Sequence, residues 1–202
     1  MFLWMMIALA VPLVPLTGGR LGNLARVRLR AVWAVVVAVT IQLLVITVFP
    51  NGDTMLHAAS HLLSYAIGAV FLVANRRLAG IWLAAIGATL NALVIGVNGG
   101  VMPASADALR RAGIIINPAE FENSRPISDA KLSILGDNFA WPQPMPFSNV
   151  FSFGDLLLVL SVAVMVHSVC GSRLVPRALR RRAERQLVPE TGVEPEVDER
   201  AG

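Results

Sequence analysis

Charged residues and cysteine are both scarce in this sequence. Only 15% of its 202 residues are charged, whereas a soluble domain carries about 25%. The single cysteine, Cys170, excludes an intramolecular disulfide framework. No CxxC pair, no phosphate-binding loop and no serine–histidine–aspartate order is found, so the commonest signatures of redox, nucleotide-binding and hydrolytic enzymes are missing.

Apolar residues are what the chain has in abundance. They make up 55% of it, and the mean hydropathy is +0.65. The formal charge of +4 comes from arginines that stand beside apolar stretches, where membrane topology explains them better than a nucleic-acid partner does. The composition therefore predicts a multi-pass membrane protein, with the lipid bilayer as its partner and no nucleic acid.

Five apolar stretches predict membrane-spanning helices. The first is marginal, because sixteen residues cover only ~24 Å, and cleavage or an interfacial position is an open alternative for it. The link between the third and fourth stretches is short, so these helices are antiparallel neighbours, and Gly68 and Gly87 would let them approach closely. We expect an all-α integral membrane protein, a five-helix bundle with spans at about 1–16, 31–49, 55–74, 78–97 and 155–170.

The arginines indicate on which side of the membrane each loop lies. The loops at 17–30 and 75–77 and the start of the tail are rich in arginine, whereas the turn at 50–53 is not. Because short cytoplasmic loops are enriched in basic residues, the N-terminus is predicted outside and the C-terminus in the cytoplasm of a bacterial cell, in the inner membrane. Residues 1–171 then form the bundle. Residues 172–202 form a cytoplasmic tail, basic at first, then acidic and disordered.

The longest stretch between spans, residues 98–154, is too rich in proline to cross a membrane. We call it the 98–154 segment. Ser105 is placed to cap a short helix through Arg111, and Ser128 to cap another through Leu135. Several aromatic residues near its end are too apolar for a solvated linker. We therefore expect a folded external segment that packs back onto the outer mouth of the bundle.

Polar side chains in the outer halves of the predicted spans indicate a pocket beneath this segment. His61 and Asn91 each lie about six residues inside the outer end of a span, roughly 9 Å deep, and Asp155 opens the last span. Such groups are a functional-site hypothesis by default, and a polar network that pins the segment to the bundle is an equal alternative. The predicted pocket residues are His57, His61, Tyr65, Asn91, Asn98, Asn138 and Asp155.

A metal site is a further alternative, because His57 and His61 are four residues apart on one helical face. The spacing alone is weak evidence, since no acidic residue stands between them. Helix packing explains the pair more simply, and no cofactor is predicted.

Several motifs give the chain a resemblance to a known family. They are HLLSYAIGAVFLVANRRLAGIW from His61, GATLNALVIGVNGGVMP from Gly87, KLSILGDN from Lys131 and FSNVFSFGDLLLVL from Phe147. With them the chain resembles a family of small bacterial integral membrane proteins known only as a domain of unknown function. The resemblance covers nearly everything except the tail. It implies that the motifs belong together, and it brings no activity.

A fainter resemblance links the start of the last span to lipoprotein signal peptidase. The run Phe151-Ser152-Phe153-Gly154-Asp155 is similar to that enzyme's Phe-Asn-x-Ala-Asp motif. The enzyme's other motif is Asn-x-x-Asp, and here Asn91 is followed by Val94 where the aspartate belongs. The resemblance implies an aspartyl intramembrane hydrolase with Asp137 and Asp155 as its catalytic pair, provided that Asp137 replaces the missing carboxylate.

The leading interpretation is a non-enzymatic bacterial membrane protein that binds a small ligand or a partner in an outward-facing polar pocket. The alternatives are the aspartyl hydrolase and the protein that binds metal through His57 and His61. Glycine- and alanine-rich helix faces would suit a protein partner or a homo-oligomer, and nothing in the sequence fixes either.

Overall fold

The computed structural model describes residues 10–48, 54–115 and 124–187, and these residues are mostly helical. Residues 1–9 of the first predicted span and the acidic part of the predicted tail lie outside them. Residues 10–16 are helical, and the remaining helices are η1 (Leu21–Arg26), α2 (Val32–Val48), α3 (Thr54–Ala74), α4 (Ile81–Val97), α5 (Ala106–Ala112), η2 (Ser133–Leu135), α6 (Phe153–Val169) and α7 (Arg177–Glu184). The strands are β1 (Met102–Pro103), β2 (Ser124–Arg125), β3 (Phe139–Trp141) and β4 (Asn149–Phe151).

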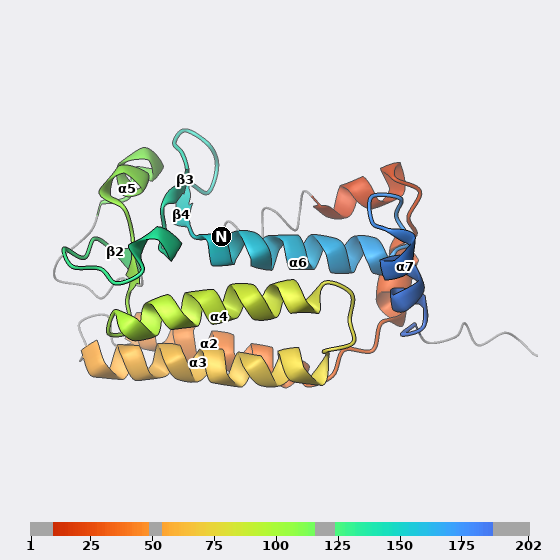
Figure 1. Ribbon diagram of the computed structural model, residues 1–202, viewed down its shortest axis with the longest axis horizontal. Helices are drawn as coiled ribbons and strands as arrows, with labels where there is room; N and C mark the ends of the chain where they lie inside the picture. The colour runs from red at the N-terminus through yellow and green to blue at the C-terminus, as the bar shows by residue number, and fades with distance from the viewer. Residues whose placement is uncertain (1–9, 49–53, 116–123, 188–202) are drawn as a thin grey trace, which may run out of the picture.

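Four long helices form the body of the molecule (Figure 1). α2, α3, α4 and α6 lie roughly parallel to the long axis, and α4 packs against α6 and α3, while α2 packs against α3. The 98–154 segment lies at one end of this bundle, which we call the capped end. η1, α7 and the turn between α3 and α4 lie at the opposite end, which we call the arginine end.

The ends of the long helices follow local chemistry. α4 begins at Ile81, three residues later than predicted, because residues 75–80 form a turn in which Gly80 has a φ of 84°. α6 begins at Phe153, two residues earlier than predicted, because Ser152 caps it: the Asp155 amide donates to the Ser152 hydroxyl, and the Ser152 amide donates to the Asp155 carboxylate. Helix ends are therefore set by caps and turns rather than by hydropathy.

Glycines line the contact between α4 and α6. A Cβ atom on Gly154 would clash with the Asn91 side chain, and one on Gly87 would contact the Gly154 carbonyl oxygen and Leu157. Small residues thus let these two backbones approach. The expectation that Gly68 and Gly87 serve the contact between the third and fourth spans is wrong, because Gly87 faces α6 and a Cβ on Gly68 would meet nothing within 4 Å.

The 98–154 segment contains strands as well as helices, so the all-α prediction needs correcting there. β1 pairs with β2 in parallel, and β3 pairs with β4 antiparallel. The predicted helix capped by Ser105 is confirmed as α5, whose Ala108 amide donates to the Ser105 hydroxyl at 3.0 Å. The predicted helix from Ser128 to Leu135 is wrong: only η2 forms, after Leu132 at a φ of 54°.

The tail's basic part is folded onto the arginine end. Ala183 of α7 packs against Ala79 and Val169, and Val27 pairs with Leu187 in an isolated β-bridge. The side chain of Arg182 also donates to the backbone carbonyl of Arg77. α7 is therefore part of the packed structure.

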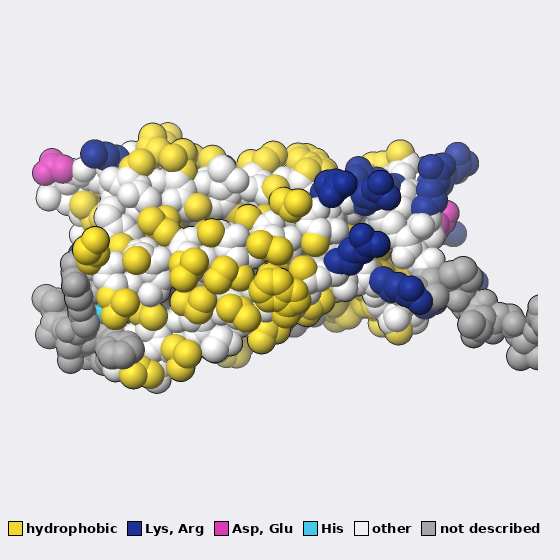
Figure 2. Space-filling model, turned by 90° about the horizontal axis from the view of Figure 1, so that it is seen from below, with side chains coloured by type: hydrophobic (Ala, Val, Ile, Leu, Met, Phe, Trp, Pro, Cys, Tyr) yellow, Lys and Arg dark blue, Asp and Glu magenta, His cyan; other side chains and the backbone are white. Residues whose placement is uncertain are grey.

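One described helix, Met55–Ala74, is long and apolar enough to cross a membrane by length and composition. Val32–Val45, Ile81–Val97 and Phe153–Val169 are shorter apolar helices. Their outward faces are apolar too, and Figure 2 shows hydrophobic side chains spread along the molecule, with Lys and Arg gathered mainly towards the arginine end. Val36, Leu63 and Leu160 are 59%, 52% and 48% exposed.

Candidate functional site beneath the 98–154 segment

Asp155 forms a clamp where the 98–154 segment enters α6. One carboxylate oxygen, Oδ2, accepts from the Ser152 backbone amide at 2.9 Å. The other, Oδ1, accepts from Asn91 Nδ2 at 2.9 Å. Both oxygens of Asp155 are thus bonded within the protein, one to its own helix cap and the other to α4.

Asn91 and Ser152 complete this clamp. Asn91 is buried on α4, and its Oδ1 lies 2.9 Å from the Ser152 hydroxyl, which also lies 3.0 Å from Asp155 Oδ2. The hydroxyl has one hydrogen and two acceptors within reach, and its own oxygen accepts the Asp155 amide at 3.1 Å. The absent side chain of Gly154 makes room for the Asn91 amide between the helices. The three polar side chains fix α4 to the start of α6.

Asp137 is bonded in a different way. Its backbone amide donates to the Pro103 carbonyl at 2.8 Å, and its carbonyl accepts from the Ser105 amide at 3.1 Å, which fixes the residue beside β1. Its side chain is 5% exposed, and Oδ2 accepts from the Ser124 hydroxyl at 2.5 Å. Oδ1 is buried and has no hydrogen-bond partner among the described residues.

Burial changes the proton affinity of Asp137. Removal from water raises its pKa to about 6, opposed by the hydrogen bond from Ser124 and increased further by the charge of Asp155. The two predicted catalytic carboxylates are therefore within electrostatic reach of each other. Asp137 changes charge near neutral pH, a property common at functional sites.

His61 and Tyr65 border the cluster from α3. Their rings stack with centroids 5.6 Å apart, and His61 Nδ1 lies 3.3 Å from the Gly100 carbonyl oxygen. Tyr65 also packs against the buried cluster of Val94, Ile95 and Met102. The structure thus brings together five of the predicted residues: His61, Tyr65, Asn91, Asp137 and Asp155.

Asn98 and Asn138 stabilise turns. Asn98 Nδ2 donates to the Val94 and Lys131 carbonyls at 2.8 Å each, and its Oδ1 accepts from the Lys131 amide. Asn138 donates to the carbonyl of Ser133 at 2.7 Å. These bonds to backbone groups stabilise turns of the 98–154 segment. The two asparagines therefore serve the fold and not the carboxylates of Asp137 and Asp155.

His57 is buried on α3, one turn before His61. Within the described ranges no three His, Cys, Asp or Glu side chains gather in a way that would hold a metal ion. The two histidines therefore lack a third ligand of these types there, and two imidazoles alone make a weak metal site.

The motifs that carry the family resemblance meet at this cluster. A Cβ on Gly136 would clash with the Pro103 carbonyl, so Leu-Gly-Asp packs directly on Asn-Gly-Gly-x-Met-Pro. Gly100 has a φ of 90° and packs against Ala58, where a side chain would clash. Sequence reasoning missed Ser124, since no local pattern marks a hydroxyl thirteen residues from the carboxylate it serves. Ser152 did carry a signal, because Ser-x-x-Asp before an apolar run is a capping signature.

The two carboxylates of the cluster differ in hydrogen bonding: both oxygens of Asp155 accept a bond, and Oδ1 of Asp137 has no partner among the described residues. Asp137 Oδ1 can therefore take a hydrogen bond from an incoming donor. An unsatisfied buried acceptor costs about 1–3 kcal/mol, so a donor placed there would be favoured.

The family comparison agrees with the resemblance seen in the sequence. The model of the Family of unknown function (DUF5317) matches residues 26–167, and the chain belongs to that family. No curated protein and no solved structure matches the chain.

Proposed function

We propose that this family member is a five-span membrane protein, non-enzymatic, that binds a small ligand at Asp137 in an outward-facing polar site. The observation that carries the ligand site is the buried Asp137 Oδ1, which has no partner among the described residues. Its neighbour Asp155, by contrast, is bonded at both oxygens.

The membrane placement rests on length, surface and charge. α2, α4 and α6 contain 17 residues each, about 26 Å, close to the roughly 30 Å of a bilayer core. A soluble bundle would not expose apolar side chains along its length as Figure 2 shows. The arginines of the short loops gather at one end, which favours a cytoplasmic arginine end and an external capped end in the bacterial inner membrane.

The chemistry of Asp137 selects the class of ligand. An oxygen that only accepts hydrogen bonds favours a donor, and a carboxylate favours a cationic one such as a small amine. Because the pKa of Asp137 is about 6, the site is negatively charged above that pH and neutral below it. An amine should therefore bind better at pH 7.5 than at pH 5.

The test is thermal stability of the purified full chain with a panel of small primary amines, and the matching neutral alcohols, at both pH values. We expect amines to raise the melting temperature at pH 7.5, and Asp137→Asn to remove that response. Asp107→Asn is the matched control, because Asp107 is an exposed carboxylate of the same segment, paired with Arg110 and Arg111. No amine response in the unaltered chain, or a response retained in Asp137→Asn, would contradict the proposal.

A second candidate, the aspartyl hydrolase, is favoured by one observation. The charge of Asp155 contributes to the raised pKa of Asp137, so Asp137 is placed to hold the proton of a shared-proton pair. The two bonded oxygens of Asp155 weigh against it, because a catalytic base needs a free oxygen for the water.

Cleavage of a lipoprotein precursor by purified protein separates the two candidates. A hydrolase loses cleavage in both Asp137→Asn and Asp155→Asn, whereas the binding protein cleaves nothing in any form.

A further inference from the structure

A second feature lies at the arginine end, far from Asp137. A cavity of about 360 Å³ opens between the turn after α3, the segment before α2, and Gln186, which lies two residues after the end of α7. This volume falls in the range of small-ligand sites. Four of its lining residues are arginines: Arg28, Arg30, Arg76 and Arg77.

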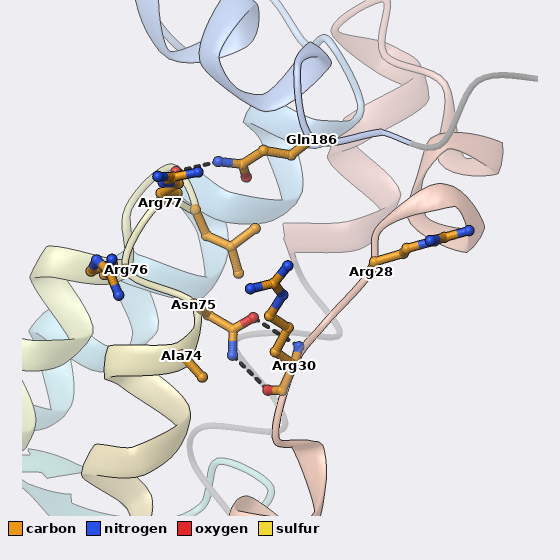
Figure 3. Close-up of a pocket in the computed structure, with 8 residues that line it drawn as sticks. Arg28, Arg30, Ala74, Asn75, Arg76, Arg77 and Gln186 are labelled. Atoms are coloured by element: carbon orange, nitrogen blue, oxygen red, sulfur yellow. Dashed lines mark hydrogen bonds between the residues drawn. The ribbon is translucent and has the colours of Figure 1, made fainter.

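Hydrogen bonds between the Asn75 side chain and the backbone of Arg30 and Phe71 hold the cavity wall together. The Arg30 backbone amide donates to Asn75 Oδ1 at 3.0 Å, and Asn75 Nδ2 donates to the Arg30 carbonyl at 2.7 Å (Figure 3). Asn75 Nδ2 also donates to the Phe71 carbonyl at 2.8 Å. The buried Asn75 therefore joins the two sides of the cavity and has no donor to spare for a ligand.

The backbone acceptors near the cavity are occupied as well. The Arg77 carbonyl accepts from Gln186 Nε2 and from Arg182 Nε, and the Arg76 carbonyl accepts from Arg182. The groups left are the guanidinium donors and one acceptor, the buried Gln186 Oε1, which has no hydrogen-bond partner among the described residues. Figure 3 shows the Arg30 side chain pointing into the space beside Asn75, while Arg28 extends away from it.

These guanidinium groups have no acidic counterpart in the part of the chain that the structure describes. The ion pairs found there join Asp107 to Arg110 and to Arg111, at the other end of the molecule. A cavity rich in donors, carrying positive charge and with no ion pair between its arginines and a described carboxylate suits an anion with several acceptor oxygens. Phosphate is one such anion, because its oxygens, like those of a carboxylate, match the planar fork of arginine donors.

We infer that this cavity binds the phosphate group of an anionic membrane lipid. A lipid is favoured over free phosphate because Ala74 and Leu78 also line the cavity, which lies where the apolar helix surface ends. The acyl chains would lie along that surface while the phosphate meets the arginines. Basic pockets between spanning helices on the cytoplasmic side bind lipid headgroups in this way.

The inference rests on the membrane placement in the proposed function and is independent of Asp137. Its test is native mass spectrometry of the detergent-purified full chain, titrated separately with phosphatidylglycerol, phosphatidylcholine and inorganic phosphate. The test variant is the double substitution Arg76→Gln and Arg77→Gln. The matched control, Arg110→Gln with Arg111→Gln, removes the same charge from the capped end. Arg30→Gln is a milder second variant should the double variant fold poorly.

We expect phosphatidylglycerol to bind more tightly than phosphatidylcholine, and the Arg76/Arg77 variant to weaken it roughly 10- to 30-fold, since each arginine near a membrane surface adds about a 5-fold preference for anionic lipid. The Arg110/Arg111 control should bind normally. Inorganic phosphate that competes at the lipid's concentration would assign the cavity to a free anion and overturn the inference. Equal binding of both lipids, or equal loss in control and test variant, would also overturn it. Asp137→Asn should leave lipid binding unchanged, so the two proposals fail separately.

Discussion

Asp137 and Asp155 carry the same functional group and lie in one cluster, yet their surroundings give them different roles. Asp155 caps α6 and bonds Asn91, so both of its oxygens serve the fold. Asp137 is fixed through its backbone, and its side chain is held only by Ser124. A substitution of Asp155 should therefore act mainly on stability, and a substitution of Asp137 mainly on ligand binding.

The pH dependence of stability should reveal Asp137. Its pKa is about 6 in the folded protein and about 3.9 in an unfolded chain, so the folded state holds the extra proton between those values. The free energy of unfolding then falls as pH rises from about 4 to about 6, by roughly 2–3 kcal/mol, and levels off above. Asp137→Asn should remove this component from denaturation profiles recorded at pH 4 to 8. Profiles that stay parallel in variant and unaltered chain would show that Asp137 does not titrate in this way.

The clamp should be visible in the stability of single variants. Ser152→Ala removes the cap of α6 and a bond to Asn91, and should lower the free energy of unfolding by about 1–2 kcal/mol. Asn91→Ala leaves Asp155 Oδ1 without its donor and should cost about 1–3 kcal/mol. Thr89→Ala is the control on α4, because its hydroxyl bonds only the carbonyl of its own helix at an exposed position. Denaturation in detergent measures the free energy of unfolding of all three variants. An equal loss in Thr89→Ala and in the two clamp variants would refute a special role for the clamp.

At the scale of elements, the contact between α4 and α6 depends on missing side chains. Gly87→Ala should destabilise the protein, because the new methyl group would meet the Gly154 carbonyl and Leu157. Gly96→Ala is the matched control on the same helix: its methyl group would lie 3.6 Å from Leu62, an ordinary contact, and alanine favours a helix by about 1 kcal/mol over glycine. We expect a lower melting temperature for the first variant and an equal or higher one for the second. The reverse order would contradict the close packing of α4 on α6.

The elements that the sequence predicts well are those bounded by strong local signals. The predicted stretches 31–49 and 55–74 match α2 and α3 within a residue at each described end, since the sequence Pro-Asn-Gly-Asp and an Arg-Arg pair delimit the apolar runs. Strands β1 to β4 were not predictable, because each has two or three residues and shows no periodicity. Their pairings also join residues far apart, such as Met102 with Ser124.

The same limit applies to the site. From the sequence alone, the charge of these residues, their depth in the spans and the predicted helix starts place His61, Asn91 and Asp155 in one pocket. Whether Asp155 is free or bonded depends on side-chain geometry that no pattern encodes, and the hydroxyl of Ser124 reaches Asp137 only through the fold. The arginine cavity was visible only as a charge bias, because its shape comes from the turn at 75–80 meeting α7.

On the scale of the whole molecule, the two proposed sites lie at opposite ends of one apolar bundle. The capped end holds Asp137 within the 98–154 segment, and the arginine end holds the cavity. A membrane around the long helices would place the ligand site outside and the lipid-phosphate site at the inner surface. Both proposed sites thus depend on the orientation of the bundle.

The most direct measurement is cysteine accessibility in intact cells, with Cys170, which is buried, replaced by serine. Ala106→Cys and Ala178→Cys are matched probes, each an exposed alanine at the start of a short helix, one at each end of the bundle. The account predicts that a membrane-impermeant maleimide labels position 106 in intact cells and position 178 only after lysis. Labelling of position 178 in intact cells, or of both positions, would contradict the five-span orientation on which both sites depend.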